Sequence, residues 1–311
     1  MTALYLVGLL TILGLVQGGF DSDIENLRNG KNIFFSVGER IVGGWEAEDG
    51  QFPYTVSIRM VGATGGVGAC TGSMLNNDWI LTAAHCLARR FSYVVRVGLT
   101  DIHRPQYIVD LTREHAYIHE AYNHETSAVQ THDIGLLKLS VSIPYNDYIQ
   151  PIRIQSSLRK EVEYGNMQLV LSGYGRTDDW WAGGIVPDIL YWVYQRGITQ
   201  EECFTWYPNS QTMGPSTMCA QWYNVTNQNA CTGDSGGPLT LLDLDGQETQ
   251  VGIMSFGSQR GCNTTHPQGF VRPDQYQDWI EAQTGISFDW DSDELERTYG
   301  NKVRVVDDSD N

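Results

Sequence analysis

At 311 residues the chain exceeds an average domain, but single β-barrel domains often run to about 200–250 residues, so length alone does not fix the domain count. The formal charge of −17 repels polyanions, and we expect no nucleic-acid partner. The 33 glycines, 16 tyrosines and 9 tryptophans, without helical heptads, favour many short strands and turns. The composition therefore predicts an all-β fold.

Residues 1–18 have the features of a signal peptide. They are apolar and uncharged from Leu4 to Val16 and end at a small-residue site, Val16-Gln17-Gly18. The lack of Lys or Arg near Met1 departs from that pattern, and a membrane anchor is the alternative interpretation. Because the apolar run is short for a span, which needs about 20 residues, we expect a secreted, extracellular protein with no membrane partner.

Residues 19–40 contain no cysteine and little periodicity, and they end at Arg40, directly before the string Ile-Val-Gly-Gly that begins at Ile41. Beyond Gln51 the pattern becomes that of β-strands. Apolar and polar side chains alternate from Tyr54 to Met60, which predicts a half-buried strand. Similar runs predict strands at 93–99, 134–139 and 168–171.

Two helices are predicted in the second half of the chain. Thr199 and Glu202 have the spacing of a capping box, which predicts a short helix that ends before Pro208. Residues 275–283 place Tyr276, Trp279 and Ile280 on one helical face, and these side chains are expected in the core.

Six cysteines in a chain with a signal peptide predict three disulfide bonds, although six cysteines allow 15 pairings that sequence alone cannot separate. A metal site is the competing interpretation, but no Cys-x-x-Cys pair or Cys/His cluster at zinc spacing supports it. The sequons at Asn224 and Asn263 fit glycosylation of a secreted surface.

The most informative stretch runs from Cys231 to Pro238 and reads C-T-G-D-S-G-G-P. Glycine costs backbone entropy and buries no side chain, so packing alone does not account for this motif. The chemistry of a nucleophile does, with Ser235 attacking and the backbone N–H groups of Gly233 and Ser235 holding a developing oxyanion.

A serine hydroxyl is a weak nucleophile, so it needs a base and a group that orients the base. The string T-A-A-H-C supplies His85, and H-D-I-G-L-L-K-L supplies Asp133. The remaining histidines are expected to be ordinary surface or structural residues, with His132 beside Asp133 only by sequence adjacency; they are His103, His115, His119, His124, His132 and His266.

The order His, Asp, Ser, with these three strings and the Ile-Val-Gly-Gly motif, resembles the trypsin and chymotrypsin family of secreted serine endopeptidases over residues 41–285. The resemblance implies two six-stranded antiparallel barrels, at about 41–150 and 151–274, with the site in the cleft between them and a C-terminal helix at about 275–283. It also selects three disulfide bonds, namely Cys70–Cys86, Cys203–Cys219 and Cys231–Cys262.

The same resemblance implies a mechanism and an activation step. His85 acts as general base and acid, Asp133 orients it, and neither a cofactor nor a metal is required. Residues 19–40 become an activation peptide that a trypsin-like protease removes by cutting after Arg40. The freed ammonium of Ile41 then pairs with Asp234, and without that partner a buried carboxylate is costly.

The substrate pocket that the resemblance implies departs from that of trypsin. Its members are Asn229, Ser255, Phe256, Gly257 and Gln268. Asn229 stands where trypsin has an aspartate, so Arg and Lys lose their anchor, and Gln268 stands where trypsin and chymotrypsin have glycine. Crab collagenases of this family also carry a polar side chain there, and residues 50–54 look similar to arthropod digestive proteases. We expect cleavage after aromatic, leucine or amide side chains.

Residues 286–311 carry eight acidic and three basic side chains, and we expect an acidic, disordered tail. Its apolar residues, Phe288, Trp290, Leu295, Tyr299 and Val303, leave a docking segment open. We expect a monomer whose partners are protein or peptide substrates, its activating protease and protein inhibitors. A narrow processing protease, or a protease-fold binding protein with an obstructed pocket, is the alternative.

Overall fold

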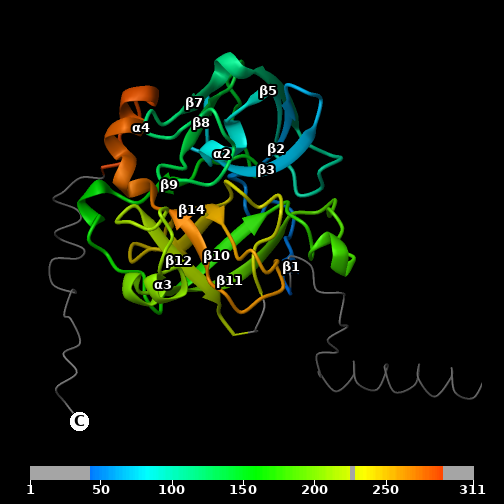
Figure 1. Ribbon diagram of the computed structural model, residues 1–311. Coiled ribbons are helices and arrows are strands. Elements are labelled where there is room, and N and C mark those ends of the chain that lie inside the picture. Colours follow the sequence, from blue (N-terminus) through cyan, green and yellow to red (C-terminus); the bar gives the residue numbers. More distant parts are fainter. Residues whose placement is uncertain (1–42, 225–227, 290–311) are drawn as a thin grey trace, which may run out of the picture. The chain divides into compact units, whose positions relative to one another are not determined.

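Two sheets, antiparallel except for one short strand, organise the computed structural model, which describes residues 43–224 and 228–289. The all-β prediction is therefore confirmed. In Figure 1 the blue and cyan strands of the first sheet lie above the green to orange strands of the second. The predicted signal peptide, Arg40 and Ile41 lie outside the described residues.

The first sheet has seven strands in the order β6-β5-β2-β3-β4-β8-β7. Its strands are β2 (Thr55–Gly62), β3 (Val67–Met74), β4 (Trp79–Thr82), β5 (Arg90–Val97), β6 (Tyr107–Thr112), β7 (Ala116–Ile118) and β8 (Gly135–Lys138). The edge strands β6 and β7 are joined by a 3-10 turn, Arg113–His115, and do not pair with each other. This half of the protein is thus a half-barrel of seven strands, where the resemblance implied a barrel of six.

The second sheet contains a closed barrel of six strands, because β11 pairs with β12 as well as with β10. These strands are β10 (Gln168–Gly173), β11 (Tyr191–Ile198), β12 (Thr217–Trp222), β13 (Pro238–Leu242), β14 (Glu248–Phe256) and β15 (Gln268–Val271). Two short strands extend it, β1 (Trp45–Glu46) on β11 and β9 (Arg153–Ile154) on β14. Strand β1 thus belongs to the second sheet although it precedes the first.

Strand β2 is buried on both faces along most of its length. The alternation of apolar and polar side chains in its sequence predicts a strand with only one face buried. Val56 and Ile58 face the first core, and Thr55 and Ser57 are also buried. The reason is the neighbouring barrel, since Thr55 Oγ1 lies 2.9 Å from Ser172 Oγ of β10. Hydrogen bonds between hydroxyl groups satisfy this inter-barrel face, so polar residues are tolerated there.

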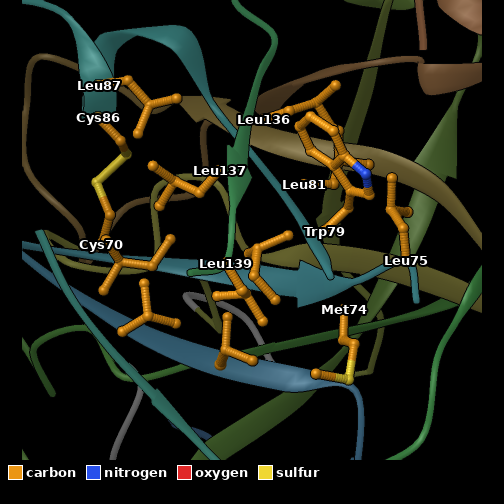
Figure 2. Packing of buried hydrophobic residues seen from close by; sticks show 14 of the residues in the cluster. Cys70, Met74, Leu75, Trp79, Leu81, Cys86, Leu87, Leu136, Leu137 and Leu139 are labelled. Carbon is orange, nitrogen blue, oxygen red and sulfur yellow. A yellow bond between two sulfur atoms is a disulfide. The ribbon is translucent and has the colours of Figure 1, made fainter. Parts of the chain in front are cut away.

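Figure 2 shows the core of the first sheet, with the Cys70–Cys86 disulfide on the side of Leu87 and Leu137 and with Leu136 on the side of Leu81 and Trp79. The other disulfide bonds join Cys203 to Cys219 and Cys231 to Cys262. These are the three pairs that the family resemblance implies.

Helices are short and lie at the ends of strands. They are α2 (Ala84–Leu87), α3 (Gln200–Trp206) and α4 (Gln277–Thr284), with 3-10 turns at Ser157–Arg159, Trp180–Ala182 and Pro273–Tyr276. Thr199 caps α3 by accepting a hydrogen bond from the Glu202 amide at 3.1 Å. In the described part of the chain, no helix has the length and apolar character needed to cross a bilayer.

The C-terminal helix α4 packs on the first barrel, and the chain beyond it stays in contact with the protein. Phe288 is only 7 % exposed and belongs to the core of the first sheet. Asp289 accepts hydrogen bonds from Ser156 Oγ, Ser157 N and Ser157 Oγ at 2.7–3.0 Å. The first four residues of the predicted acidic tail are therefore docked, and residues 290–311 lie outside the described residues.

Candidate active site

The pairing of β4 with β8 brings His85 and Asp133 to the same end of the first sheet. Thr82 is the register partner of Gly135, and both site residues lie just beyond that pair. His85 Nδ1 lies 2.7 Å from Asp133 Oδ2, and the His85 backbone N–H donates to Asp133 Oδ1 at 2.8 Å. A neutral imidazole that donates from Nδ1 keeps its lone pair on Nε2, so Nε2 is the basic atom.

Asp133 is fully buried and receives a further hydrogen bond. Ser255 Oγ donates to Asp133 Oδ2 at 2.6 Å. Charge-assisted hydrogen bonds of this kind compensate a carboxylate for the loss of water. Sequence reasoning placed Ser255 only in the pocket wall and missed this contact, because Ser255 and Asp133 are 122 residues apart.

His132 fixes the turn that presents Asp133, and its contacts go beyond sequence adjacency. It has φ 58°, a left-handed conformation that few non-glycine residues adopt. Its ring stacks on His119 with centroids 5.1 Å apart, and its Nδ1 lies 3.0 Å from Tyr276 Oη. The turn before the site is thus tied to the C-terminal end of the chain. No signal in the sequence indicates this contact.

The loop that carries Ser235 rests on strands β3 and β4 of the first sheet. The Thr71 N–H donates to the carbonyl of Ser235 at 2.9 Å, and Thr71 Oγ1 donates to the carbonyl of Gly233 at 3.0 Å. Gly236 has φ +80°, and a Cβ there would lie 2.0 Å from Thr82 Oγ1. The glycine after Ser235 is therefore required for the close approach of the two barrels.

Ser235 is half-buried and lies beside the Cys70–Cys86 disulfide, as His85 does. Cys86 Sγ lies 3.6 Å from the Ser235 carbonyl oxygen and 3.8 Å from His85 Nε2. Among the hydrogen bonds of the described residues, none joins Ser235 Oγ to His85 Nε2. Catalytic hydrogen bonds of ligand-free enzymes are often long and shorten when substrate binds.

Asp234 is a fully buried carboxylate whose partners are backbone N–H groups. Gly175 and Cys231 donate to its two oxygens at 2.7 and 2.8 Å. Burial raises its pKa to about 6, against the lowering effect of these two hydrogen bonds. Within residues 43–224 and 228–289, no cation forms an ion pair with it.

The first described residue lies next to the segment that leads to Asp234. Gln228 Nε2 donates a hydrogen bond to the carbonyl of Gly43. Gly43 has φ +71°, and a Cβ there would lie 2.8 Å from Gln228 Cγ. The chain thus reaches the second barrel two residues after Ile41.

A cavity of about 470 Å³ opens beside Ser235, and it contains four of the five expected pocket residues: Ser255, Phe256, Gly257 and Gln268. Gln268 is 2 % exposed, and its amide pairs with the backbone of Ala230, accepting from N at 2.7 Å and donating to O at 2.8 Å. Its side chain is therefore fixed in the cavity wall.

Asn229 is not among the residues that line this cavity. It is fully buried, and its Nδ2 donates to the carbonyls of Cys262, at 3.3 Å, and of Thr264. The side chain is thus turned toward the 262–264 segment and supports the wall from behind. Its predicted role in the substrate pocket stays a prediction.

The described residues offer two His/Cys/Asp groupings close enough to surround a metal ion, namely Cys70, His85 and Cys86, and Asp179, Cys231 and Cys262. In both, the two cysteines form a disulfide bond. Disulfide sulfurs are not thiolates, and the thiolate is the form that binds metals. Neither grouping therefore has the donors of a metal site.

Comparison with known families shows that the family model described as Trypsin matches residues 41–280. The chain belongs to the trypsin family. This trypsin-family protein is 33 % identical over 249 residues to a collagenase of Hypoderma lineatum, with 80 % of this chain and 89 % of the relative covered. It is also 33 % identical over 258 residues to serine protease 1 of Drosophila melanogaster, with 80 % and 87 % covered.

A solved structure of HL collagenase superposes on this trypsin-family protein with a TM-score of 0.69 at 32 % sequence identity. The match covers 79 % of this chain and 99 % of the collagenase chain. Together, these relationships confirm the predicted family, and they establish the protein as a serine endopeptidase that acts on protein substrates.

Proposed function

We propose that this serine endopeptidase is secreted as a zymogen, is activated by cleavage after Arg40, and hydrolyses peptide bonds through His85, Asp133 and Ser235. The observation that carries the proposal is the double contact of Asp133 with His85, through the ring Nδ1 and the backbone N–H. A carboxylate that binds both groups fixes the orientation of the ring and its tautomer.

In the proposed reaction, Ser235 Oγ attacks the scissile carbonyl carbon while His85 Nε2 takes the hydroxyl proton. The tetrahedral intermediate collapses, the C–N bond breaks, and His85 returns the proton to the leaving amine. Water then attacks the acyl-enzyme with His85 again as base, which releases the acid and restores Ser235. Asp133 stabilises the imidazolium that forms in both steps.

Backbone N–H groups of the Ser235 loop are the candidates for the oxyanion hole. Asp234, Gly236 and Gly237 donate to backbone carbonyls at 2.7–3.0 Å. Among the described backbone hydrogen bonds, Gly233 and Ser235 donate to none, so their N–H groups remain available for a developing oxyanion. Preorganised donors of this kind need no rearrangement during the reaction.

The environment of Asp234 supports activation by a new N-terminus. A buried carboxylate with a raised pKa gains most from a cationic partner, and the ammonium of Ile41 would supply one. The Gly43–Gln228 contact holds the chain near the loop that the ammonium has to reach. We assign the cleavage to a trypsin-like protease because the bond follows an arginine.

Specificity follows from the fixed amide of Gln268. The cavity beside Ser235 has this neutral side chain and the Phe256 ring in its wall, and the buried side chain behind it is the neutral Asn229. We therefore propose cleavage after aromatic, leucine or amide side chains in preference to Arg or Lys. The relative from Hypoderma lineatum is named a collagenase, which agrees with a specificity unlike that of trypsin.

The proposed extracellular location agrees with three disulfide bonds and with two exposed sequon asparagines, Asn224 and Asn263. Glycosylation of both, a monomeric state and control by protein inhibitors are part of the proposal. A glycan on Asn263 would lie next to Cys262 at the cavity rim.

The decisive experiment measures cleavage of a peptide library by the secreted protein before and after trypsin treatment, with Ser235→Ala as control. We expect activity only after cleavage at Arg40 and none in the variant. Sustained preference for Arg would overturn the specificity, and correctly cleaved wild-type protein that cuts no peptide would favour a protease-fold binding protein instead.

A further inference from the structure

A loop beside the cavity, residues 176–186, exposes four large apolar side chains. Trp180 is 71 % exposed, Trp181 62 %, Ile185 50 % and Val186 51 %. Contiguous exposed apolar surface is uncommon on soluble proteins and marks interaction sites. The two tryptophans also line the cavity beside Ser235, so this end of the loop adjoins the candidate active site.

The base of this loop is closed by hydrogen bonds. The Thr177 N–H donates to the Ile185 carbonyl at 3.0 Å, and the Ile185 N–H donates to Thr177 Oγ1 at 3.1 Å. Arg176 Nη1 donates to the Gly184 carbonyl at 2.8 Å. A Cβ on Gly184 would lie 1.9 Å from the Asp178 carbonyl oxygen, so the turn is close-packed. The tryptophans are therefore presented by a defined backbone.

Asp179 fastens the loop to the opposite rim of the cavity. Its Oδ2 accepts a hydrogen bond from the backbone N–H of Cys262 at 2.8 Å. A Cβ on Gly261 would lie 2.1 Å from this oxygen and 3.1 Å from Trp181 Cζ2. Gly261 thus leaves the space that both side chains occupy, and the Asp179 contact fixes where the tryptophans stand.

We propose that Trp180, Trp181, Ile185 and Val186 form a second substrate-binding surface, which takes an apolar segment of the polypeptide next to the residue held in the cavity. Asp179 is the positioning residue of this surface. The inference rests on the proposed function, because it assigns the occupant as substrate. Preformed tryptophan surfaces bind well because little side-chain freedom is lost and much apolar area is covered.

The first test compares two long peptides with the same scissile bond, flanked on both sides either by Leu and Phe or by Ser and Gly, and a short substrate of one amino acid. Activated wild-type protein and the double variant Trp180→Ala/Trp181→Ala are measured. We expect the variant to lose about tenfold or more in kcat/KM, mainly through KM, on the apolar peptide. Because both tryptophans also line the cavity, the other two substrates should lose some activity as well, but the loss on the apolar peptide should exceed theirs several-fold.

Phe91→Ala is the matched control, since Phe91 is 70 % exposed and is not among the residues that line the cavity. It should leave all three rates unchanged. An equal loss of the double variant on every substrate, or no loss on the apolar peptide, would overturn the proposal.

The second test separates positioning from general damage to the loop. Asp179→Ala should reproduce the loss on the apolar peptide, whereas Asp179→Asn keeps an oxygen acceptor for the Cys262 N–H and should retain most of the activity. Gly261→Ala should behave like Asp179→Ala. If Asp179→Ala affects the short substrate as strongly as the apolar peptide, its role is not that of a positioning residue for this surface.

A binding measurement distinguishes failure of this inference from failure of the proposed function. Titration of Ser235→Ala protein with the apolar peptide should change the tryptophan fluorescence, and the response should be lost when Trp180 and Trp181 are also replaced. Binding without hydrolysis by wild-type protein would contradict the proposed function alone. Hydrolysis combined with equal binding of both long peptides would contradict the inference alone.

Discussion

Ser255 Oγ and His85 Nδ1 both contact the same oxygen of Asp133, at 2.6 and 2.7 Å. Ser255 lies in the second barrel, whereas Asp133 and His85 lie in the first, so this oxygen joins the two halves of the candidate site. Ser255 is therefore both a wall residue of the cavity and a support for the carboxylate.

Replacement of Ser255 should weaken catalysis by removing this support. A hydrogen bond to a charged group contributes about 1.5–3 kcal/mol, so we expect Ser255→Ala to lower kcat by roughly tenfold to a hundredfold. Ser255→Thr retains the hydroxyl and is the control. Steady-state kinetics on one peptide measure both, and an unchanged kcat in Ser255→Ala would show that the contact has no catalytic effect.

Asp234 should make the uncleaved protein less stable as the pH rises. Its pKa in the folded protein is about 6, above the ordinary value of 3.8, so the folded state holds this proton more tightly than the unfolded state does. The resulting stabilisation is complete below about pH 4 and is lost as the pH rises through 6. The total change is on the order of 3 kcal/mol.

Denaturant unfolding between pH 4 and 7 tests this expectation in an Arg40→Gln background that cannot be cleaved. Asp234→Asn should remove this part of the pH dependence, whereas Asp110→Asn, at an exposed position, should not. Identical pH dependence with Asp and Asn at position 234 would rule the explanation out.

Gly236 should not tolerate alanine. At φ +80° a Cβ would meet Thr82 Oγ1 at 2.0 Å and the Thr71 carbonyl oxygen at 2.5 Å. We expect Gly236→Ala to lose both activity and at least about 2 kcal/mol of stability. Gly246→Ala is a matched control, because Gly246 also has φ +80° but nothing lies within 4 Å of its Cβ position. Equal destabilisation of the two variants would mean that backbone strain alone is responsible.

Gln268 should limit the size of the side chain that the cavity accepts. Gln268→Gly removes the amide from the wall, and we expect the preference for Phe or Tyr over Leu to rise several-fold. The loss of both hydrogen bonds to Ala230 should lower the free energy of unfolding by about 1–3 kcal/mol. Profiling with a peptide library measures this preference. An unchanged ratio of cleavage after Phe or Tyr to cleavage after Leu would show that another part of the cavity wall limits the size of the side chain.

The sequence was sufficient for the fold class and for the strings that form the site, because each string carries local chemistry. It was not sufficient to predict the burial or orientation of a side chain that contacts a residue far away in the sequence. Thr55 is buried because Ser172 faces it, and Asn229 turns away from the cavity because the carbonyls of Cys262 and Thr264 accept from it. Phe288 belongs to the predicted acidic tail but packs in the core of the first sheet.

The open edge of the first sheet was unpredictable for a related reason. Alternation along a strand does not indicate which strands it pairs with, and β6 and β7 follow each other in the chain without pairing. The catalytic assignment of Ser235 and the activation by Ile41 stay predictions.

The contact between His132 and Tyr276 joins two segments that are synthesised at different times. The turn that presents Asp133 is held by a residue that leaves the ribosome more than a hundred residues later. The Ser235 loop is also absent from early nascent chains. A growing chain therefore lacks parts of the candidate site until the Ser235 loop and Tyr276 have been synthesised.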